Sequence, residues 1–412
     1  MITTGKYTIF VRTAVIAAVV QLCAPSLAAE EKSRDWGVSA SGGFSHVFGT
    51  FPTADQFFAG PTNYPQATLQ MAYSTKPTNS GKFAEAYNWP TVGFGVTWSG
   101  LHTIPYQENA FLKDMVSVYG FFERDFYKTT GFSVGYDLKF GLGFNASKFD
   151  PVNNPNNIIF GSSATFCIGG GLYVKWRPVP NVELALKGNL RHHSVGRLAF
   201  PNFGLNEAGA EVSVRYYASA PQAKQTTHTM KDEFERKISY NIQAGGGIHH
   251  CNTEWEAFHD APEDPDQKVN NMPAWPKFFA SFNATYRYAL KFSSGIGFDT
   301  FLTTREYMDR LRECDIILHG EEAVKNCGGY NPFSMGISLI QNFHYGNFSI
   351  TCAVGVYLFK HYGIQEQLSW SFQRIGLRYD FPALGGMFLS MTCKSHYFTR
   401  AEMLEFGVGV KI

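Results

Sequence analysis

The sequence predicts an all-β protein, a transmembrane antiparallel up-and-down β-barrel of about 12–16 strands. Three observations support this class: long runs of alternating apolar and polar residues, an unusual composition, and connections that are alternately tight and long. Of the 412 residues, 17% are charged, 16% are aromatic and 40 are glycine, whereas a soluble globular chain carries about 25% charged residues. The sequence contains no run of 18 or more apolar residues, which argues against membrane-spanning helices.

The N-terminus has the pattern of a secretory signal peptide. A short basic segment precedes an apolar stretch from Ala14 to Val20 and a small-residue ending, PSLAAE. This pattern predicts cleavage after Ala28 or Ala29. We therefore assign residues 1–29 to a signal peptide. Since no linker or change in composition follows, residues 30–412 are predicted to form one outer-membrane β-barrel domain.

Alternation with a period of two is clearest in FSVGYDLKFGLGFNAS, residues 132–147. An ordinary strand has about five or six residues, so this run is too long for one. It fits a tilted membrane-spanning strand with its apolar face toward lipid and its polar face toward the lumen. A similar strand begins at Ala164. Further strands are predicted to begin near Trp36, Ala67, Val92, Met115, Val182, Asn206, Lys237, Lys277, Ser293, Pro332, Phe348, Leu368, Met387 and Glu402.

The connections between these runs alternate in length. YKTTG, RPVPN and HYGN are tight turns, whereas residues 148–161, 253–276 and 306–331 are long and polar. Bacterial barrels have short periplasmic turns and long outer loops, so residues 196–205 are predicted to face the cell exterior. This segmentation gives 16 strands, with 12 or 14 as alternatives because the first 110 residues are hard to divide.

The final run, EFGVGVKI, resembles the C-terminal recognition signal of outer-membrane barrels, although it ends in Ile412 where that signal usually has an aromatic residue. The structural alternative is a soluble periplasmic β-sandwich. Such a protein would have less glycine and shorter alternating runs. The sequence therefore favours the bacterial outer membrane as the location.

A cluster of polar residues stands out in LRHHSVGRLAFPNFGLNEAG, residues 190–209. Alternation places His192 and Ser194 at the end of an apolar, lipid-facing row, and two polar side chains there are costly without a function. Asn206 shares that outer face on the next strand, whereas His193 and Glu207 point into the lumen. Serine, imidazole and amide correspond to the nucleophile, base and orienting group of a hydrolase.

The sequence HHS followed by PNFGLN on adjacent strands resembles the PagL-type lipid A deacylases (acyloxyacyl hydrolases), especially their longer relatives from Bacteroidetes-like bacteria. The resemblance extends over roughly residues 60–220. It implies a serine esterase that removes an ester-linked acyl chain from lipid A, the membrane anchor of lipopolysaccharide, without a metal or organic cofactor. By motif position, the histidine is His192, the serine is Ser194, and the Asn-x-Gly run is Asn202 and Gly204.

Two positions depart from the family pattern. The third catalytic member, usually glutamate, is Asn206, which stabilises an imidazolium less than a carboxylate does and so predicts a slower enzyme. The asparagine that normally follows the serine as an oxyanion donor is replaced by Val195, and losing one such donor costs about 10²–10³ in rate. The backbone N–H groups of Val195 and Gly196, or the side chain of Asn202, are the candidate substitutes. An inactive homologue is the alternative.

The sequence also bears on other functions. A net charge of +1 argues against a nucleic-acid partner. The run GIHHCN, residues 247–252, contains two histidines and Cys251. No second pair of metal ligands stands at a recognisable spacing from it, so no metal site is predicted. Cys314 and Cys327 flank a polar loop and could form a disulfide. The competing function is a non-enzymatic barrel, either porin-like or a scaffold, with a relic site. An open pore would favour transport, whereas a lumen crowded with side chains would favour the enzyme or the scaffold. The oligomeric state is left open.

Overall fold

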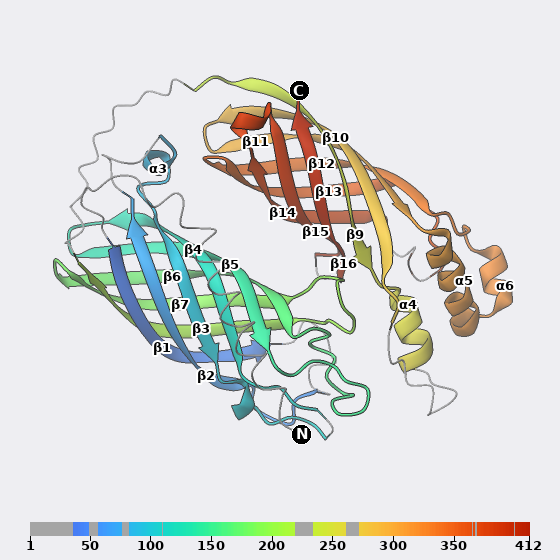
Figure 1. Ribbon diagram of the computed structural model, residues 1–412, viewed down its shortest axis with the longest axis horizontal. Helices are drawn as coiled ribbons and strands as arrows, with labels where there is room; N and C mark the ends of the chain where they lie inside the picture. Colours follow the sequence, from blue (N-terminus) through green and yellow to red (C-terminus); the bar gives the residue numbers. More distant parts are fainter. Residues whose placement is uncertain are drawn as a thin grey trace, which may run out of the picture.

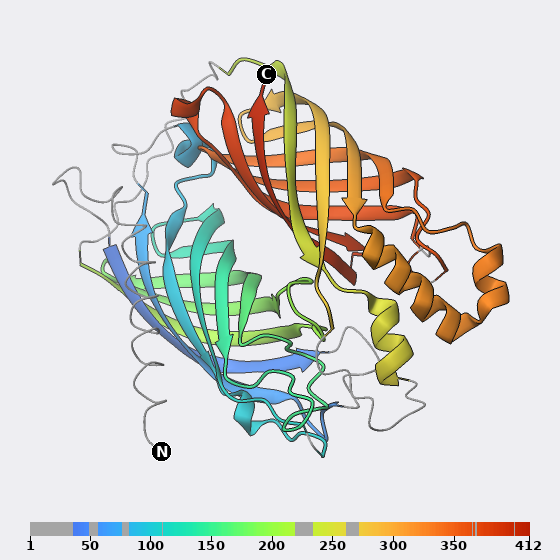
Figure 2. The ribbon, with the colours of Figure 1, turned by 45° about the vertical axis from the view of Figure 1, so that its right-hand side comes forward.

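The chain folds into two closed antiparallel β-barrels of eight strands each, which lie side by side (Figures 1 and 2). The structure, a computed structural model, describes residues 36–48, 57–75, 82–108, 110–218, 234–260, 272–364, 366, 369–398 and 400–412. The predicted all-β, antiparallel barrel class is confirmed. The predicted signal peptide, with its cleavage point after Ala28 or Ala29, lies outside the described residues. None of the described helices is long and apolar enough to cross a membrane.

The first barrel contains the first eight strands, each paired with its neighbour in sequence. The sheet closes where β1 pairs with β8, with Gly37 opposite Tyr217. Its strands are β1 (Trp36–Phe48), β2 (Asn63–Ser74), β3 (Thr91–Ser99), β4 (Met115–Lys128), β5 (Phe132–Asn145), β6 (Ala164–Val179), β7 (Val182–Ser194) and β8 (Leu205–Tyr217). Two short helices lie in its connections, α3 (Lys82–Ala86) and η1 (Leu101–Thr103).

The second barrel closes in the same way, by pairing of β16 with β9, where Lys411 lies opposite Asn241. Its strands are β9 (Lys237–His249), β10 (Trp275–Ala289), β11 (Phe292–Thr303), β12 (Phe333–Tyr345), β13 (Phe348–Phe359), β14 (Ser371–Asp380), β15 (Met387–His396) and β16 (Arg400–Lys411). Its helical segments are α4 (Asn252–Trp255), η2 (Glu256–Asp260), α5 (Arg305–His319), α6 (Glu321–Asn326) and η3 (Pro382–Leu384). Helices α4, α5 and α6 gather at one end of this barrel (Figure 1).

The prediction of one barrel over residues 30–412 is wrong, although the described residues do contain 16 strands. Alternation reports which face of a strand is apolar, but it carries no information about which strands pair. Here β8 returns to β1 instead of pairing with β9. The same 16 strands therefore form two small rings and not one large ring.

The lumen of the first barrel is filled by charged side chains. The Glu123 carboxylate lies 2.7 Å from Lys175 Nζ, 3.0 Å from Lys187 Nζ and 2.7 Å from Arg215 Nη1. All four side chains are buried. Since a buried charge is stable only when it is paired and hydrogen-bonded, these four residues form a polar core that crosses the ring.

The outer walls of both barrels are apolar. Strand residues that alternate with the lumenal ones are exposed, among them Leu69, Leu172, Leu186 and Val212 on the first barrel and Ile242, Ile296, Leu339 and Phe406 on the second. Apolar residues outside and polar residues inside are the pattern of barrels that sit in a membrane.

The two barrels contact each other at both ends. At one end the Tyr345 ring packs on Tyr87 and Phe122, with ring centroids 5.5 and 5.4 Å apart. At the other end, Arg197 Nε donates a hydrogen bond to the carbonyl oxygen of Ala401 over 2.7 Å. The connection between β7 and β8, which carries Arg197, therefore reaches the second barrel.

Candidate active site

The candidate site lies on the outer wall of the first barrel, where β7 ends and β8 begins. The register of these strands places His192 directly opposite Asn206. Leu186 and Leu190 on the same face of β7 are each 59% exposed, so His192 and Ser194 continue an outward-facing row. This is the side on which the alternation of the sequence places both residues.

His192 is oriented by Asn206. Its Nδ1 lies 2.7 Å from the side-chain oxygen Oδ1 of Asn206. An amide oxygen can only accept a hydrogen bond, so Nδ1 carries the proton and Nε2 remains an acceptor. A histidine held in this tautomer is prepared to act as a base through Nε2.

Ser194 is held by the connection that follows it. Its Oγ accepts hydrogen bonds from Asn202 Nδ2 over 2.8 Å and from the backbone N–H of Gly196 over 3.1 Å. Asn202 Nδ2 also donates to the Gly196 carbonyl over 2.6 Å, and Asn202 Oδ1 accepts the Val195 N–H over 3.4 Å. Among the described contacts, Ser194 Oγ makes no hydrogen bond to His192. Through these hydrogen bonds, Asn202 holds the loop around the Ser194 hydroxyl.

Two glycines make room for this arrangement. Gly196 and Gly204 have φ angles of +61° and +77°, a left-handed conformation that side-chain-bearing residues rarely adopt. A Cβ atom at position 204 would lie 2.9 Å from His192 Cε1. Glycine at this position therefore allows the imidazole to pack against the loop.

The structure brings together the residues that the sequence singled out. The contacts described above place six of them in one cluster: His192, Ser194, Gly196, Asn202, Gly204 and Asn206. Val195 differs, because its N–H is already engaged by Asn202 and its side chain is only 5% exposed. The backbone donor nearest to Ser194 Oγ is therefore Gly196 and not Val195.

The neighbouring lumenal residues are separate from this site. His193 is fully buried, and its Nε2 lies 2.9 Å from Ser117 Oγ. Glu207 pairs with Arg191 over 2.8 Å inside the ring. The carboxylate next to Asn206 in sequence thus belongs to the polar core, as the alternation predicted.

The histidine and cysteine run after β9 has other partners. His249 Nε2 lies 2.9 Å from Thr303 Oγ1, and its ring packs on Tyr307 with centroids 4.2 Å apart. The described cysteines, Cys314 and Cys327 included, are all free thiols. Cys327 Sγ donates to the Val324 carbonyl over 3.1 Å, so the disulfide considered from the sequence is not formed.

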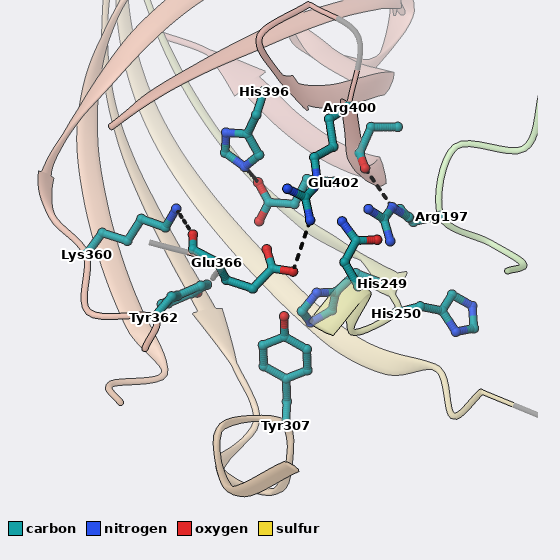
Figure 3. A pocket seen from close by; sticks show the side chains of 12 residues that line it. Arg197, His249, His250, Tyr307, Lys360, Tyr362, Glu366, His396, Arg400 and Glu402 are labelled. Carbon is teal, nitrogen blue, oxygen red and sulfur yellow. Dashed lines mark hydrogen bonds and ion pairs between the residues drawn. The ribbon is translucent and has the colours of Figure 1, made fainter. Parts of the chain in front are cut away.

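A polar cavity lies at the mouth of the second barrel, and the sequence did not predict it (Figure 3). Its charged lining comes from Arg197 of the first barrel and from Lys360, Glu366, Arg400 and Glu402 of the second. These residues belong to separate segments of the chain and form no local motif. Only the folded structure brings them together.

The fold places the chain among antiparallel β-barrel proteins. Residues 238–412 match the family described as acyloxyacyl hydrolase, C-terminal domain. This segment, which is less than half of the chain, is similar to the acyloxyacyl hydrolases. The matched segment is the second barrel, whereas His192, Ser194 and Asn206 lie on the first.

No curated protein matches the chain. Among solved structures, a mutant of Rh. blastica porin aligns with 9% identity and a TM-score of 0.16, covering 92% of this chain and 100% of the porin. A NanC porin aligns with 6% identity and a TM-score of 0.15, covering 91% of this chain and 97% of that one. At these scores the likeness carries no argument about function.

Proposed function

We propose that the protein is an outer-membrane serine esterase that removes an ester-linked acyl chain from lipid A. The observation that carries this proposal is the 2.7 Å contact between His192 Nδ1 and Asn206 Oδ1 on an apolar outer wall, with Ser194 two residues away on the same face. A substrate whose acyl chains lie in the membrane would meet this wall directly. The family of the second barrel supports hydrolysis of an acyl ester.

Each residue has a role in this reaction. Ser194 Oγ attacks the ester carbonyl while His192 Nε2 accepts its proton, and His192 then gives that proton to the leaving sugar hydroxyl. Water, activated by the same histidine, releases the fatty acid from Ser194. For the attack, Ser194 Oγ must exchange its hydrogen bond with Asn202 for one with His192, a change that commonly accompanies substrate binding.

The oxyanion of the tetrahedral intermediate needs donors near Ser194. The Gly196 N–H and the Asn202 amide are both within 3.1 Å of Ser194 Oγ. Once the hydroxyl has turned away, these two groups are free to donate to the carbonyl oxygen. They would take the place of the oxyanion-donating asparagine that Val195 replaces in this chain.

The competing function is transport through the barrel or a purely structural role. The buried ion pairs of Glu123 with Lys175, Lys187 and Arg215 cross the first lumen, and this crowding favours an enzyme or a scaffold over a pore. Enzyme and scaffold differ in their effect on lipid A.

Expression in a bacterial host with hexa-acylated lipid A tests the enzyme directly. We expect a lipid A species lighter by one ester-linked acyl chain, detected by mass spectrometry of lipid extracts. Membranes permeabilised with detergent should be assayed as well, so that restricted access to the substrate cannot hide the activity. Unchanged lipid A in both assays would favour the scaffold with an inactive site.

The orienting role of Asn206 predicts opposite effects of two substitutions. Asn206→Ala should lower the deacylation rate about 10²-fold, because His192 loses the group that fixes its tautomer. Asn206→Asp should raise the rate about tenfold, because a carboxylate stabilises the imidazolium better than an amide does. Rates are measured on the same lipid substrate in detergent micelles.

Glu207→Gln is the matched control, since Glu207 is adjacent in sequence but faces the lumen. It should leave the rate per folded molecule unchanged, although the loss of the Arg191 partner lowers stability. If Glu207→Gln reduced the rate more than Asn206→Ala did, the assignment of faces would be wrong by one residue.

A further inference from the structure

The cavity at the mouth of the second barrel has more positive than negative charge. Of its two carboxylates, Glu402 is already engaged: it pairs with Lys277 and Lys394, and its Oε2 lies 2.9 Å from His396 Nε2. Glu366, the other carboxylate, lies near Lys360 and Arg400. Figure 3 shows Lys360 and Arg400 reaching toward Glu366, with Arg197 on the opposite side of the view.

Arg197 is the most unusual member of this group. Its side chain is buried and its guanidinium carbon lies 5.1 Å from the centre of the Phe200 ring. Its Nε donates to the Ala401 carbonyl, but its Nη1 has no hydrogen-bond partner among the described residues. No described carboxylate lies within ion-pair distance of Arg197. A buried guanidinium without a counter-charge is costly, so an anion here would stabilise it.

Lys360 and Arg400 both lie near Glu366. Lys360 Nζ donates to the backbone carbonyls of Glu366 and Ser369, over 2.6 and 3.1 Å. Burial lowers the pKa of Lys360 to about 8. Arg400 Nη2 lies 3.8 Å from Glu366 Oε1, near the limit for an ion pair. Together with Arg197, the lining therefore carries three cations against the two carboxylates Glu366 and Glu402.

We propose that Arg197, Lys360 and Arg400 bind a phosphate monoester at the junction of the two barrels. A phosphate monoester carries about −1.5 to −2 charges near neutral pH, so it would supply the counter-charge that buried Arg197 lacks among the described residues, and arginine forks bind its oxygens in pairs. The free space in the cavity is about that of one water molecule. One phosphate oxygen would enter it, and the remainder of the group would lie at its mouth.

The position of this site relates it to the candidate active site. Arg197 is three residues beyond Ser194 on the same connection, and Gly196 packs near Leu404 of β16. A lipid whose headgroup phosphate bound here would have its acyl esters close to the first barrel. Assignment of the phosphate to the lipid substrate rests on the proposed function, whereas phosphate binding itself does not.

The test measures binding by the full chain in maltoside micelles, with Ser194→Ala as the background so that no lipid is consumed. The probes are hexa-acylated lipid A, the same lipid with its phosphates removed, and inorganic phosphate. Arg197→Gln and Arg400→Gln should each weaken binding of the phosphorylated lipid about tenfold or more and leave binding of the dephosphorylated lipid unchanged. Arg400 is partly exposed, with 29% of its side chain accessible. The Arg400 variant therefore tests the site even if the Arg197 variant does not fold.

Arg305→Gln is the matched control, because Arg305 lies on α5 with 73% of its side chain exposed; it should not change affinity. Tighter binding of the lipid than of inorganic phosphate would assign the source to a lipid headgroup, and equal binding would assign it to free phosphate. Equal affinity of the parent and both arginine variants, or equal binding of the two lipids, would overturn the proposal. If binding depends on phosphate but the protein never alters lipid A, the phosphate site stands and the esterase function is rejected. If the protein deacylates lipid A but binding does not depend on phosphate, the esterase function stands and the phosphate site is rejected.

Discussion

Replacing Ser194 with alanine should abolish the release of an acyl chain from lipid A, with a loss of at least about 10³ in rate. The hydroxyl oxygen is the only atom in this scheme that forms the covalent intermediate, and nucleophile and base act as a unit in such sites. His192→Ala should therefore cost about as much, and the double variant should be no worse than either single variant. Mass spectrometry of lipid A from permeabilised membranes measures the loss.

Ser162→Ala provides a matched control for this experiment. Ser162 precedes β6, the strand beside β7, and its hydroxyl only accepts a hydrogen bond from the Ala164 N–H over 3.3 Å. This variant should deacylate like the parent. All variants should keep the heat-dependent gel migration of a folded barrel. Parental activity in the Ser194→Ala protein would show that the nucleophile is a different residue.

Replacing Glu123 with glutamine should lower the free energy of unfolding of the first barrel by about 3–5 kcal/mol, the usual cost of removing one partner from a buried ion pair. Its carboxylate is the shared partner of Lys175, Lys187 and Arg215. Without it, three buried cations face one another with Glu183 as the nearest remaining counter-charge for two of them. Urea unfolding in micelles, followed by tryptophan fluorescence, measures the change.

Glu321→Gln is the control for that measurement. Glu321 is an exposed residue of α6, 3.7 Å from Lys325, and 73% of its side chain is accessible. An exposed pair of this kind contributes little, so the variant should unfold like the parent. A change below about 1 kcal/mol for Glu123→Gln would mean that water, and not Glu123, balances the lumenal cations.

The positions of the strands could be predicted from the sequence because alternation is a local property. The strands at Met115, Phe132, Ala164 and Val182 begin where the pattern placed them, and the strand expected near Leu368 begins three residues later. Pairing could not be predicted, because the backbone groups that close a ring are the same in every strand. The long polar run of residues 218–236 separates the last strand of the first barrel from the first strand of the second.

The candidate site divides in the same way. The shared face of His192, Ser194 and Asn206 follows from the period of two on adjacent strands, and the sequence was sufficient to place them. The use of Asn202 to hold Ser194 depends on the path of a loop, which no periodic pattern describes. The cluster of Arg197 with Lys360 and Arg400 depends on how one barrel lies against the other.

The closure of each ring on itself has a consequence for how the chain unfolds. Every strand of the first barrel pairs within residues 36–217, and every strand of the second pairs within residues 237–411. Each ring therefore contains all the backbone hydrogen bonding that makes its own unfolding cooperative. The contacts described between the rings are made by side chains and loops. A single two-state transition is the wrong description for such a chain. Damage to one ring leaves the backbone ladder of the other intact, so half of the protein can persist as a folded barrel after the other half has opened.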